Sequence, residues 1–237
     1  MATINLLYKR RYDITDKIYI AIPTVGEVVD NEDDYYSMVA ALTSMPIDMM
    51  VQLDEIGIDF TKITEYELFI MLFHGLQMQD TSMIFGDLDL SKFERAINEK
   101  THDPVLVDPV NDIVIDRAVQ NKIAETLRTI HHLEKDRRMP ANEDAKVFML
   151  ERAKIKAKRR KRKKVSELED LIIAMVNTEQ YKYGFYETRD LTIYQFNESV
   201  RQVVSKIEYE HRMNGVYAGT ISAKDLSQDD LNWLKRK

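Results

Sequence analysis

A dense basic segment is the part of this sequence whose residue types have the clearest chemical capacity. Ten of the 34 Lys and Arg residues lie between Arg152 and Lys164, and no acidic residue interrupts them. We refer to residues 152–164 as the basic run. Such a segment could neutralise several phosphate groups of a nucleic acid, with binding that weakens steeply as salt rises. Its uninterrupted core is formed by Lys158, Arg159, Arg160, Lys161, Arg162, Lys163 and Lys164.

Three interpretations of the basic run stay open: a phosphate-binding segment, a patch like a nuclear-localisation signal, and an exposed linker. It contains no aromatic residue, so stacking on single-stranded bases is not expected. Outside it, the remaining 24 basic residues face 40 acidic ones, a balance of −16. A general nucleic-acid binder is expected to spread positive charge over a face. We therefore favour a linker that pairs with the acidic remainder of the chain.

The other residues capable of chemistry form no recognisable catalytic or metal motif. None of the five histidines lies in a His-x-x-x-His or His-Glu-x-x-His pattern. Asp87 and Asp89 alternate but lack the glycine and the final glutamate of a calcium loop, so we expect a loop and a helix cap there. No phosphate-binding loop, dinucleotide fingerprint or nucleophile elbow is present. The chain has no cysteine, which excludes disulfides, thiolate zinc sites and a cysteine nucleophile. We expect no catalytic residue, no metal and no cofactor.

Methionine and aromatic residues provide the candidates for protein contact. Apart from Met1, seven methionines lie within the first 85 residues. Methionine fills gaps in cores and is also over-used on promiscuous binding grooves, and a groove of that kind could hold an apolar helix. Core packing explains these side chains equally well. The candidate partner-binding residues are Met49, Met50, Phe69, Phe73, Tyr183, Phe185 and Trp233.

Composition favours a mainly α protein. A chain of 237 residues with only 7 glycines and 5 prolines has few tight turns. Its length allows one large domain or two small ones. No apolar run approaches the ~20 residues of a membrane span, and the first residues lack the order of a signal peptide. We therefore expect no membrane contact and a place in the cytoplasm of the producing cell.

The first part of the chain is expected to hold a β-like opening followed by helices. Residues 4–29 are the most β-like, with a hairpin formed by residues 4–10 and 17–23. The acidic cluster at residues 30–34 suits a helix N-terminus, and the face of that helix would contain Tyr36, Val39, Ala40 and Thr43. A second helix would run from Pro46 to Gly57. Thr64 and Glu67 fit a capping box that opens a third helix, which is apolar nearly all round.

The middle of the chain is expected to contain a short helix, a second hairpin and a longer helix. Ser91 would cap the short helix, with Phe93 and Ile97 facing inward. Residues 105–107 and 113–115 flank a turn and would form the hairpin. From Asp116 apolar residues recur at spacings of three and four, which predicts a helix as far as Pro140. Its inward residues would be Val119, Ile123, Leu127 and Ile130.

The last part is expected to be helical. One long helix over residues 142–175 would contain the basic run, after which Leu168, Leu171, Ile172 and Met175 restore an apolar face. An aromatic loop with Tyr181, Tyr183, Phe185 and Tyr186 follows, and then a helix over residues 192–213 and a short helix capped by Ser227. The predicted organisation is a helical N-terminal domain with one or two small β-hairpins (1–140), a long basic connecting helix (141–178) and a small helical C-terminal domain (179–237).

Four stretches resemble a known class of proteins as a set. They are "YYSMVAALTSMPIDMMVQLDEIGIDFTKITEYELFIMLF", "FGDLDLSKFE", "LTIYQFNESV" and "GVYAGTISAKDLSQDDLNWL". They resemble tail assembly chaperones, or related tail-cluster proteins, encoded by phages and prophages of Gram-positive bacteria. The resemblance implies a non-enzymatic protein that binds the long, helical tape-measure protein and keeps it soluble during tail assembly. Such proteins are commonly made in a short and a frameshifted long form, which here would separate near residues 159–164.

Two alternatives accompany that interpretation. The chain could be a structural protein of the virion, at the tail or the head–tail junction, and would then be found in mature particles. It could instead bind nucleic acid through the basic run. The sequence leaves the oligomeric state open.

Overall fold

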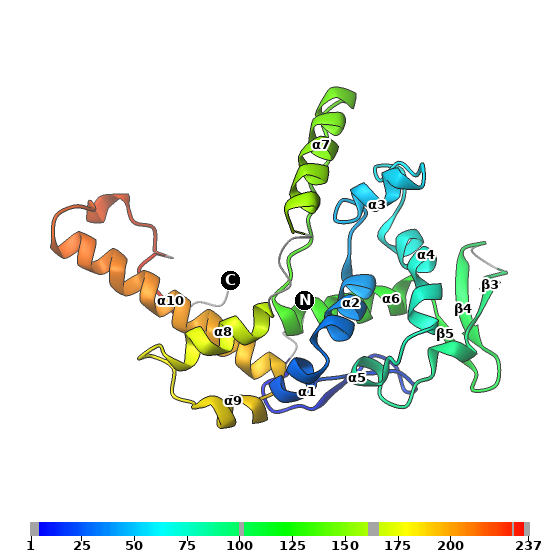
Figure 1. Ribbon diagram of the computed structural model, residues 1–237, viewed down its shortest axis with the longest axis horizontal. Helices are drawn as coiled ribbons and strands as arrows, with labels where there is room; N and C mark the ends of the chain where they lie inside the picture. Colours follow the sequence, from blue (N-terminus) through cyan, green and yellow to red (C-terminus); the bar gives the residue numbers. More distant parts are fainter. Residues whose placement is uncertain (1–4, 100–101, 161–165, 229, 235–237) are drawn as a thin grey trace.

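The computed structural model describes residues 5–99, 102–160, 166–228 and 230–234. It is mainly helical with two small antiparallel sheets (Figure 1), which confirms the mainly α class that was predicted. The helices are α1 Val25–Asp30, α2 Glu32–Thr43, α3 Met50–Glu55, α4 Glu65–Gln77, α5 Ser82–Phe85, α6 Arg117–His131, α7 Glu143–Arg160, α8 Glu167–Val176, α9 Phe185–Asp190 and α10 Ile193–Tyr217, with 3-10 turns η1 Leu90–Lys92 and η2 Ala223–Asp225. The strands are β1 Arg11–Asp13, β2 Tyr19–Ala21, β3 Glu94–Ile97, β4 Pro104–Asp108 and β5 Ile113–Ile115.

The β-like opening is a hairpin only in part. β1 pairs antiparallel with β2 in the register Tyr12 to Ile20. The second predicted strand is therefore confirmed, whereas the first, at residues 4–10, was wrong because β1 lies at Arg11–Asp13. The residues that follow form α1 rather than a strand. Thr24 and Glu27 close a capping box there, because the Thr24 hydroxyl accepts from the Glu27 amide at 3.1 Å and the Glu27 carboxylate accepts from the Thr24 amide at 2.6 Å.

The helices predicted in the first half are present, but the inward face of α2 is different. The capping box of Thr64 and Glu67 opens α4 as predicted. α2 packs against α6 and α4, and this turns Tyr35, Met38 and Leu42 into the core while Ala40 is exposed. The face predicted for α2 is therefore confirmed at Val39 and Thr43, which are buried, and wrong at Ala40, while Tyr36 is half-buried.

A third strand occupies the place of the predicted short helix. β3 pairs antiparallel with β4, and β4 pairs antiparallel with β5, so the predicted hairpin is part of a three-stranded sheet. Phe93 is buried as expected, but Ile97 is 69% exposed. Ser91 is not the cap of η1: the Asp89 carboxylate accepts from the Ser91 amide at 3.0 Å. Pairing with β4 explains the strand, because residues 94–97 find their backbone partners there.

The predicted long helix over residues 142–175 is two helices. α7 ends at Arg160, and Ser166 is the N-cap of α8, where its hydroxyl accepts from the Glu169 amide at 2.8 Å. The Ser166 backbone is extended rather than helical (φ −59°, ψ 111°). Upstream, α6 ends well before Pro140, with His132 in the left-handed conformation (φ 52°). In the last part, residues 226–228 and 230–234 form turns rather than the predicted short helix.

One apolar core joins the beginning and the end of the chain. It includes Leu6, Ile20 and Leu127 together with Leu168 and Phe196. Backbone hydrogen bonds add to this junction: the Val25 amide donates to the Leu191 carbonyl at 2.9 Å, and the Ile193 amide donates to the Pro23 carbonyl at 2.8 Å. A second, smaller apolar cluster of Ile47, Leu53, Phe60 and Leu68 holds Met149 of α7. The predicted domain boundaries stay a prediction.

Candidate functional site

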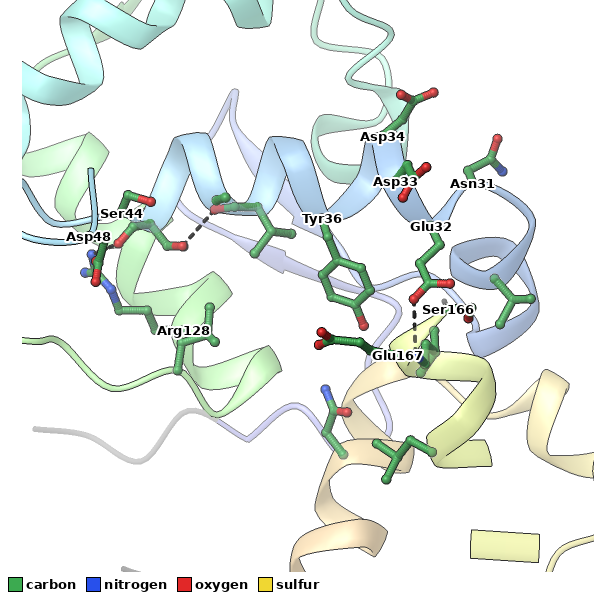
Figure 2. A pocket seen from close by; sticks show the side chains of 18 of the residues that line it. Asn31, Glu32, Asp33, Asp34, Tyr36, Ser44, Asp48, Arg128, Ser166 and Glu167 are labelled. Carbon is green, nitrogen blue, oxygen red and sulfur yellow. Dashed lines mark hydrogen bonds between the residues drawn. The ribbon is translucent and has the colours of Figure 1, made fainter. Parts of the chain in front are cut away.

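A groove of about 1230 Å³ opens between α2, the end of α6 and the start of α8 (Figure 2). Figure 2 shows Glu32 and Tyr36 of α2 directed toward the first residues of α8. The apolar residues that line the groove include Val29, Val39, Leu133, Leu168 and Leu171. The acidic residues that line it are Asp30, Glu32, Asp33, Asp34, Asp48, Glu134 and Glu167. We call it the acidic groove.

The acidic groove is shaped by contacts that close α8 onto α2. The Glu32 carboxylate accepts from the Leu168 amide at 3.1 Å, which satisfies one of the amides left without a partner at a helix N-terminus. Burial, and then the negative charges of Glu32 and Glu167, raise the pKa of Tyr36 to about 12. Tyr36 therefore stays a neutral phenol near neutral pH, so it can donate a hydrogen bond and is not available as a base.

The basic side chain at the far end of the groove is neutralised by its own chain. Arg128 is buried and donates to the Thr43 carbonyl and, at 2.6 Å, to the Glu65 carboxylate. It also lies 3.2 Å from the carboxylate of Glu125. Lys135 adds a second cation to Glu65 at 3.1 Å. Because these charges are compensated, the groove keeps the negative character of its acidic lining and suits Lys or Arg side chains of a partner.

His131, at the end of α6, has a packing role. His131 shares a hydrogen bond of 2.9 Å with the Tyr35 hydroxyl. Burial, with the adjacent His132, lowers its pKa to about 4, so it is neutral near pH 7. Within the part of the chain that the structure describes, no three His, Cys, Asp or Glu side chains gather into a group that could hold a metal ion.

α7 presents two different faces. One face packs on α3 and its neighbours, with Met149 in the second apolar cluster. Ion pairs join Lys146 to Asp59 at 3.0 Å and Lys154 to Asp54 at 2.6 Å. Hydrogen bonds from Thr61, and then from Lys146, hold the pKa of Asp59 well below its usual range. The opposite face exposes Val147, Phe148 and Ile155, each between 50% and 58%.

The basic run lies partly on α7. Arg152, Lys156 and Lys158 are exposed on that helix. Arg159 and Arg160 are the last two residues of α7. The remaining predicted residues of the run, Lys161, Arg162, Lys163 and Lys164, lie outside the described residues.

Three aromatic side chains form an exposed surface at the start of α9. Tyr183 and Phe185 are exposed, and Tyr186 is 88% exposed. We call these three residues the α9 aromatic surface. The buried Tyr181 supports this surface. Its ring centroid lies 5.4 Å from that of Tyr183, and its hydroxyl shares a hydrogen bond of 3.1 Å with the Thr188 hydroxyl. Large apolar side chains grouped at a surface are typical of protein contact sites.

The seven candidate partner-binding residues fall into separate places. Phe69 and Phe73 are only 3% and 1% exposed and pack against each other in the core, with ring centroids 5.7 Å apart. In this conformation they have almost no surface to offer. The structure brings Met49 and Met50 together at the second apolar cluster, half-buried, and brings Tyr183 and Phe185 together at α9. Trp233 is half-buried in the C-terminal turns. Partner contact by these seven residues stays a prediction.

Sequence reasoning missed two features of these surfaces. Tyr186 was grouped with the aromatic loop but not chosen as a contact residue, although it is the most exposed member. The acidic cluster at residues 30–34 was interpreted only as a helix start. The signal for a groove is absent from the local sequence, because Glu32 meets Leu168 only through the fold, 136 positions away.

A known protein family resembles the C-terminal part of the chain. Residues 158–236 match the family model of the YomV second domain. That family is of the phage and prophage type, and the similarity suggests a phage-related protein. No curated protein and no solved structure matches the chain. Over the described ranges, the helices are all too short or too polar to cross a membrane. The matched segment contains α8, the α9 aromatic surface and α10.

Proposed function

We propose that this chain is a non-enzymatic tail assembly protein of a phage, and that it binds the long helical tape-measure protein as a chaperone. The observation that carries the proposal is the α9 aromatic surface, which lies inside the segment similar to a phage-type domain. Binding to a helical tail protein is an expectation from the resemblance described above, and the surface supplies a physical means for it.

The chemistry of the α9 aromatic surface suits an amphipathic helix as its partner. Tyrosine and phenylalanine bury a large apolar area, and the tyrosine hydroxyl can still donate a hydrogen bond. Aromatic side chains are enriched among the few residues that dominate binding energy, each contributing about 2 kcal/mol or more. A helix that exposes an apolar stripe aggregates unless the stripe is covered, so a protein that covers it keeps its partner soluble.

Replacing the exposed aromatics tests the proposal. We expect the double substitution Phe185→Ser and Tyr186→Ser to lower tape-measure protein recovery in the soluble fraction at least tenfold when both proteins are co-expressed, because the loss of one dominant contact corresponds to about 1.4 kcal/mol or more. Both side chains are exposed, so the fold should be retained. The readout is the amount of partner that remains in solution after centrifugation and co-purifies with the chain.

A matched control is Tyr217→Ser, which removes an aromatic side chain that is 80% exposed at the end of α10. This variant should keep the partner soluble as the unmodified chain does. If the double variant keeps as much tape-measure protein in solution as the unmodified chain does, the proposal is wrong. Detection of the chain at fixed copy number in purified particles would favour the structural virion alternative.

Nucleic-acid binding is a second candidate, and the observation that favours it is the exposure of Arg152, Lys156 and Lys158 on α7. The same co-purification, done once with and once without nuclease, shows whether nucleic acid accompanies the chain. If nucleic acid co-purifies with the unmodified chain, we expect the double variant Lys156→Gln, Lys158→Gln to lose it and to show binding that depends less steeply on salt. That result would make the basic run the functional site.

A further inference from the structure

The outward face of α7 has no partner of its own chain in the described structure. The residues that contact α3 and its neighbours, among them Lys146, Met149 and Lys154, lie on one side. Exposed residues occupy the other side in pairs one turn apart: 143 and 144, 147 and 148, 151 and 152, 155 and 156. Figure 1 shows α7 extending upward beside α3, and the exposure of the residues on its other side leaves this face open to another molecule.

The outward face combines apolar residues with an ordered arrangement of charge. Val147, Phe148 and Ile155 supply the apolar surface. The first turn of α7 carries Glu143 and Asp144, whereas its second half is basic. Two parallel copies would place basic halves together and repel each other, whereas two antiparallel copies would place each acidic end against a basic half.

We propose that two copies of the chain pair through the outward faces of α7 in antiparallel orientation. A two-fold axis between positions 151 and 152 makes the face complementary to itself. Phe148 then lies opposite the partner's Ile155, and Glu151 lies opposite the partner's Arg152. Asp144 falls within one turn of the partner's Lys158. An antiparallel pair of this kind has the same patch on both copies, as a two-fold interface requires.

The charge pattern favours a second copy over other occupants. An acidic protein would match only the second half of α7, and a nucleic acid would be repelled by Glu143, Asp144 and Glu151. The 18 residues of α7 extend about 27 Å, so the contact is smaller than a standard interface of about 1,600 Å². A dimer that forms in the micromolar range is the expected result. The pairing is independent of the proposed function, since it uses α7 and not the α9 aromatic surface.

Charge reversal at the two-fold axis gives the sharpest test. Sedimentation velocity over a concentration series should show a monomer–dimer equilibrium for the unmodified chain. Glu151→Arg and Arg152→Glu should each weaken self-association at least tenfold, because like charges then face each other. The double variant Glu151→Arg, Arg152→Glu should dimerise again, and the two single variants should form a heterodimer when they are mixed.

The absence of cysteine allows the register to be tested directly. A mixture of the Phe148→Cys and Ile155→Cys variants should form mixed disulfides faster than either variant crosslinks with itself. Faster crosslinking of each variant with itself would overturn the antiparallel arrangement. Ile97→Ser, which removes an exposed apolar side chain from β3, should leave dimerisation unchanged. The proposal would be overturned if the unmodified chain stayed monomeric at about 100 μM. It would also be overturned if the charge-reversed variants dimerised as the unmodified chain does.

Discussion

The hydrogen bond between Tyr35 and His131 is the residue-scale feature with the clearest dependence on pH. Both side chains lie inside the protein near the junction of α2 and α6, and burial raises the pKa of Tyr35 while it lowers that of His131 to about 4. In the unfolded chain the same imidazole takes up a proton near its ordinary value of 6.5. The unfolded state therefore binds more protons between these two values.

From this difference we expect the protein to lose stability as pH falls from about 6.5 to about 4. The free energy of unfolding should decrease by at most about 1.4 kcal/mol per pH unit on account of His131. Above pH 6.5 the imidazole is neutral in both states and this dependence should disappear. Urea unfolding at pH 7.0, 5.5 and 4.5 gives the free energy of unfolding of the unmodified chain and of His131→Gln. The difference between the two proteins measures the effect of His131, because the other titrating groups contribute equally to both proteins.

His74→Gln provides the comparison for that experiment, since His74 is exposed on α4. It should preserve the full pH dependence of the unmodified chain. If His131→Gln shows the same slope between pH 6.5 and 4, burial of the imidazole is not the cause.

At the scale of elements, the start of α8 depends on a single hydroxyl together with Glu32. Ser166→Ala removes the N-cap and leaves the Glu169 amide without its partner. We expect a loss of about 1 kcal/mol in the free energy of unfolding, and faster hydrogen exchange in the first turn of α8. Ser37→Ala, in the exposed middle of α2, should be neutral or slightly stabilising because alanine is the better helix former. Unchanged exchange in α8 after Ser166→Ala would show that Glu32 alone fixes the helix start.

The elements that could be predicted from the sequence are those with local signals. The capping box of Thr64 and Glu67 and the helix start at Asp116 depend on residues three positions apart, so they are visible in the sequence. β3 could not be predicted, because its strand conformation depends on pairing with β4. α1 was hidden by β-branched residues, although its capping box at Thr24 and Glu27 was present in the sequence.

The candidate site was predicted less well than the fold, for the same reason. An exposed aromatic and a buried aromatic look alike in sequence, so Tyr183 and Phe185 were chosen together with the core residues Phe69 and Phe73. The acidic groove needs α2 and α8 side by side. Such contacts between distant residues follow from packing, and a single sequence does not reveal them.

At the scale of the whole molecule, the continuous core predicts that the first 140 residues do not fold alone. Ile193, Tyr194 and Phe196 of α10 are buried in the same cluster as Ile20 and Leu127. A fragment of residues 1–140 would expose that surface, so we expect no cooperative urea transition and a weak near-ultraviolet circular dichroism signal. The full chain should unfold in one transition.

A chain shortened after Gly219 is the control, because it keeps the core residues of α10 while it loses the C-terminal turns. It should unfold nearly as the full chain does. A sharp transition for residues 1–140 would instead support the domain boundary predicted from the sequence.

The junction between the two ends of the chain also has a consequence for biosynthesis. The Leu7 carbonyl accepts a hydrogen bond from the Gln195 side chain, 188 positions further along, and backbone hydrogen bonds join Val25 to Leu191 and Ile193 to Pro23. β2 can pack on α5 and α6 once these helices are made, whereas α1 also packs on α9 and α10, which are absent while the ribosome is still making the middle of the protein. Contacts so distant in sequence form slowly. The nascent chain therefore leaves the apolar residues of α1 partly uncovered until α9 and α10 are made, and it completes its fold only after α10 has emerged from the ribosome.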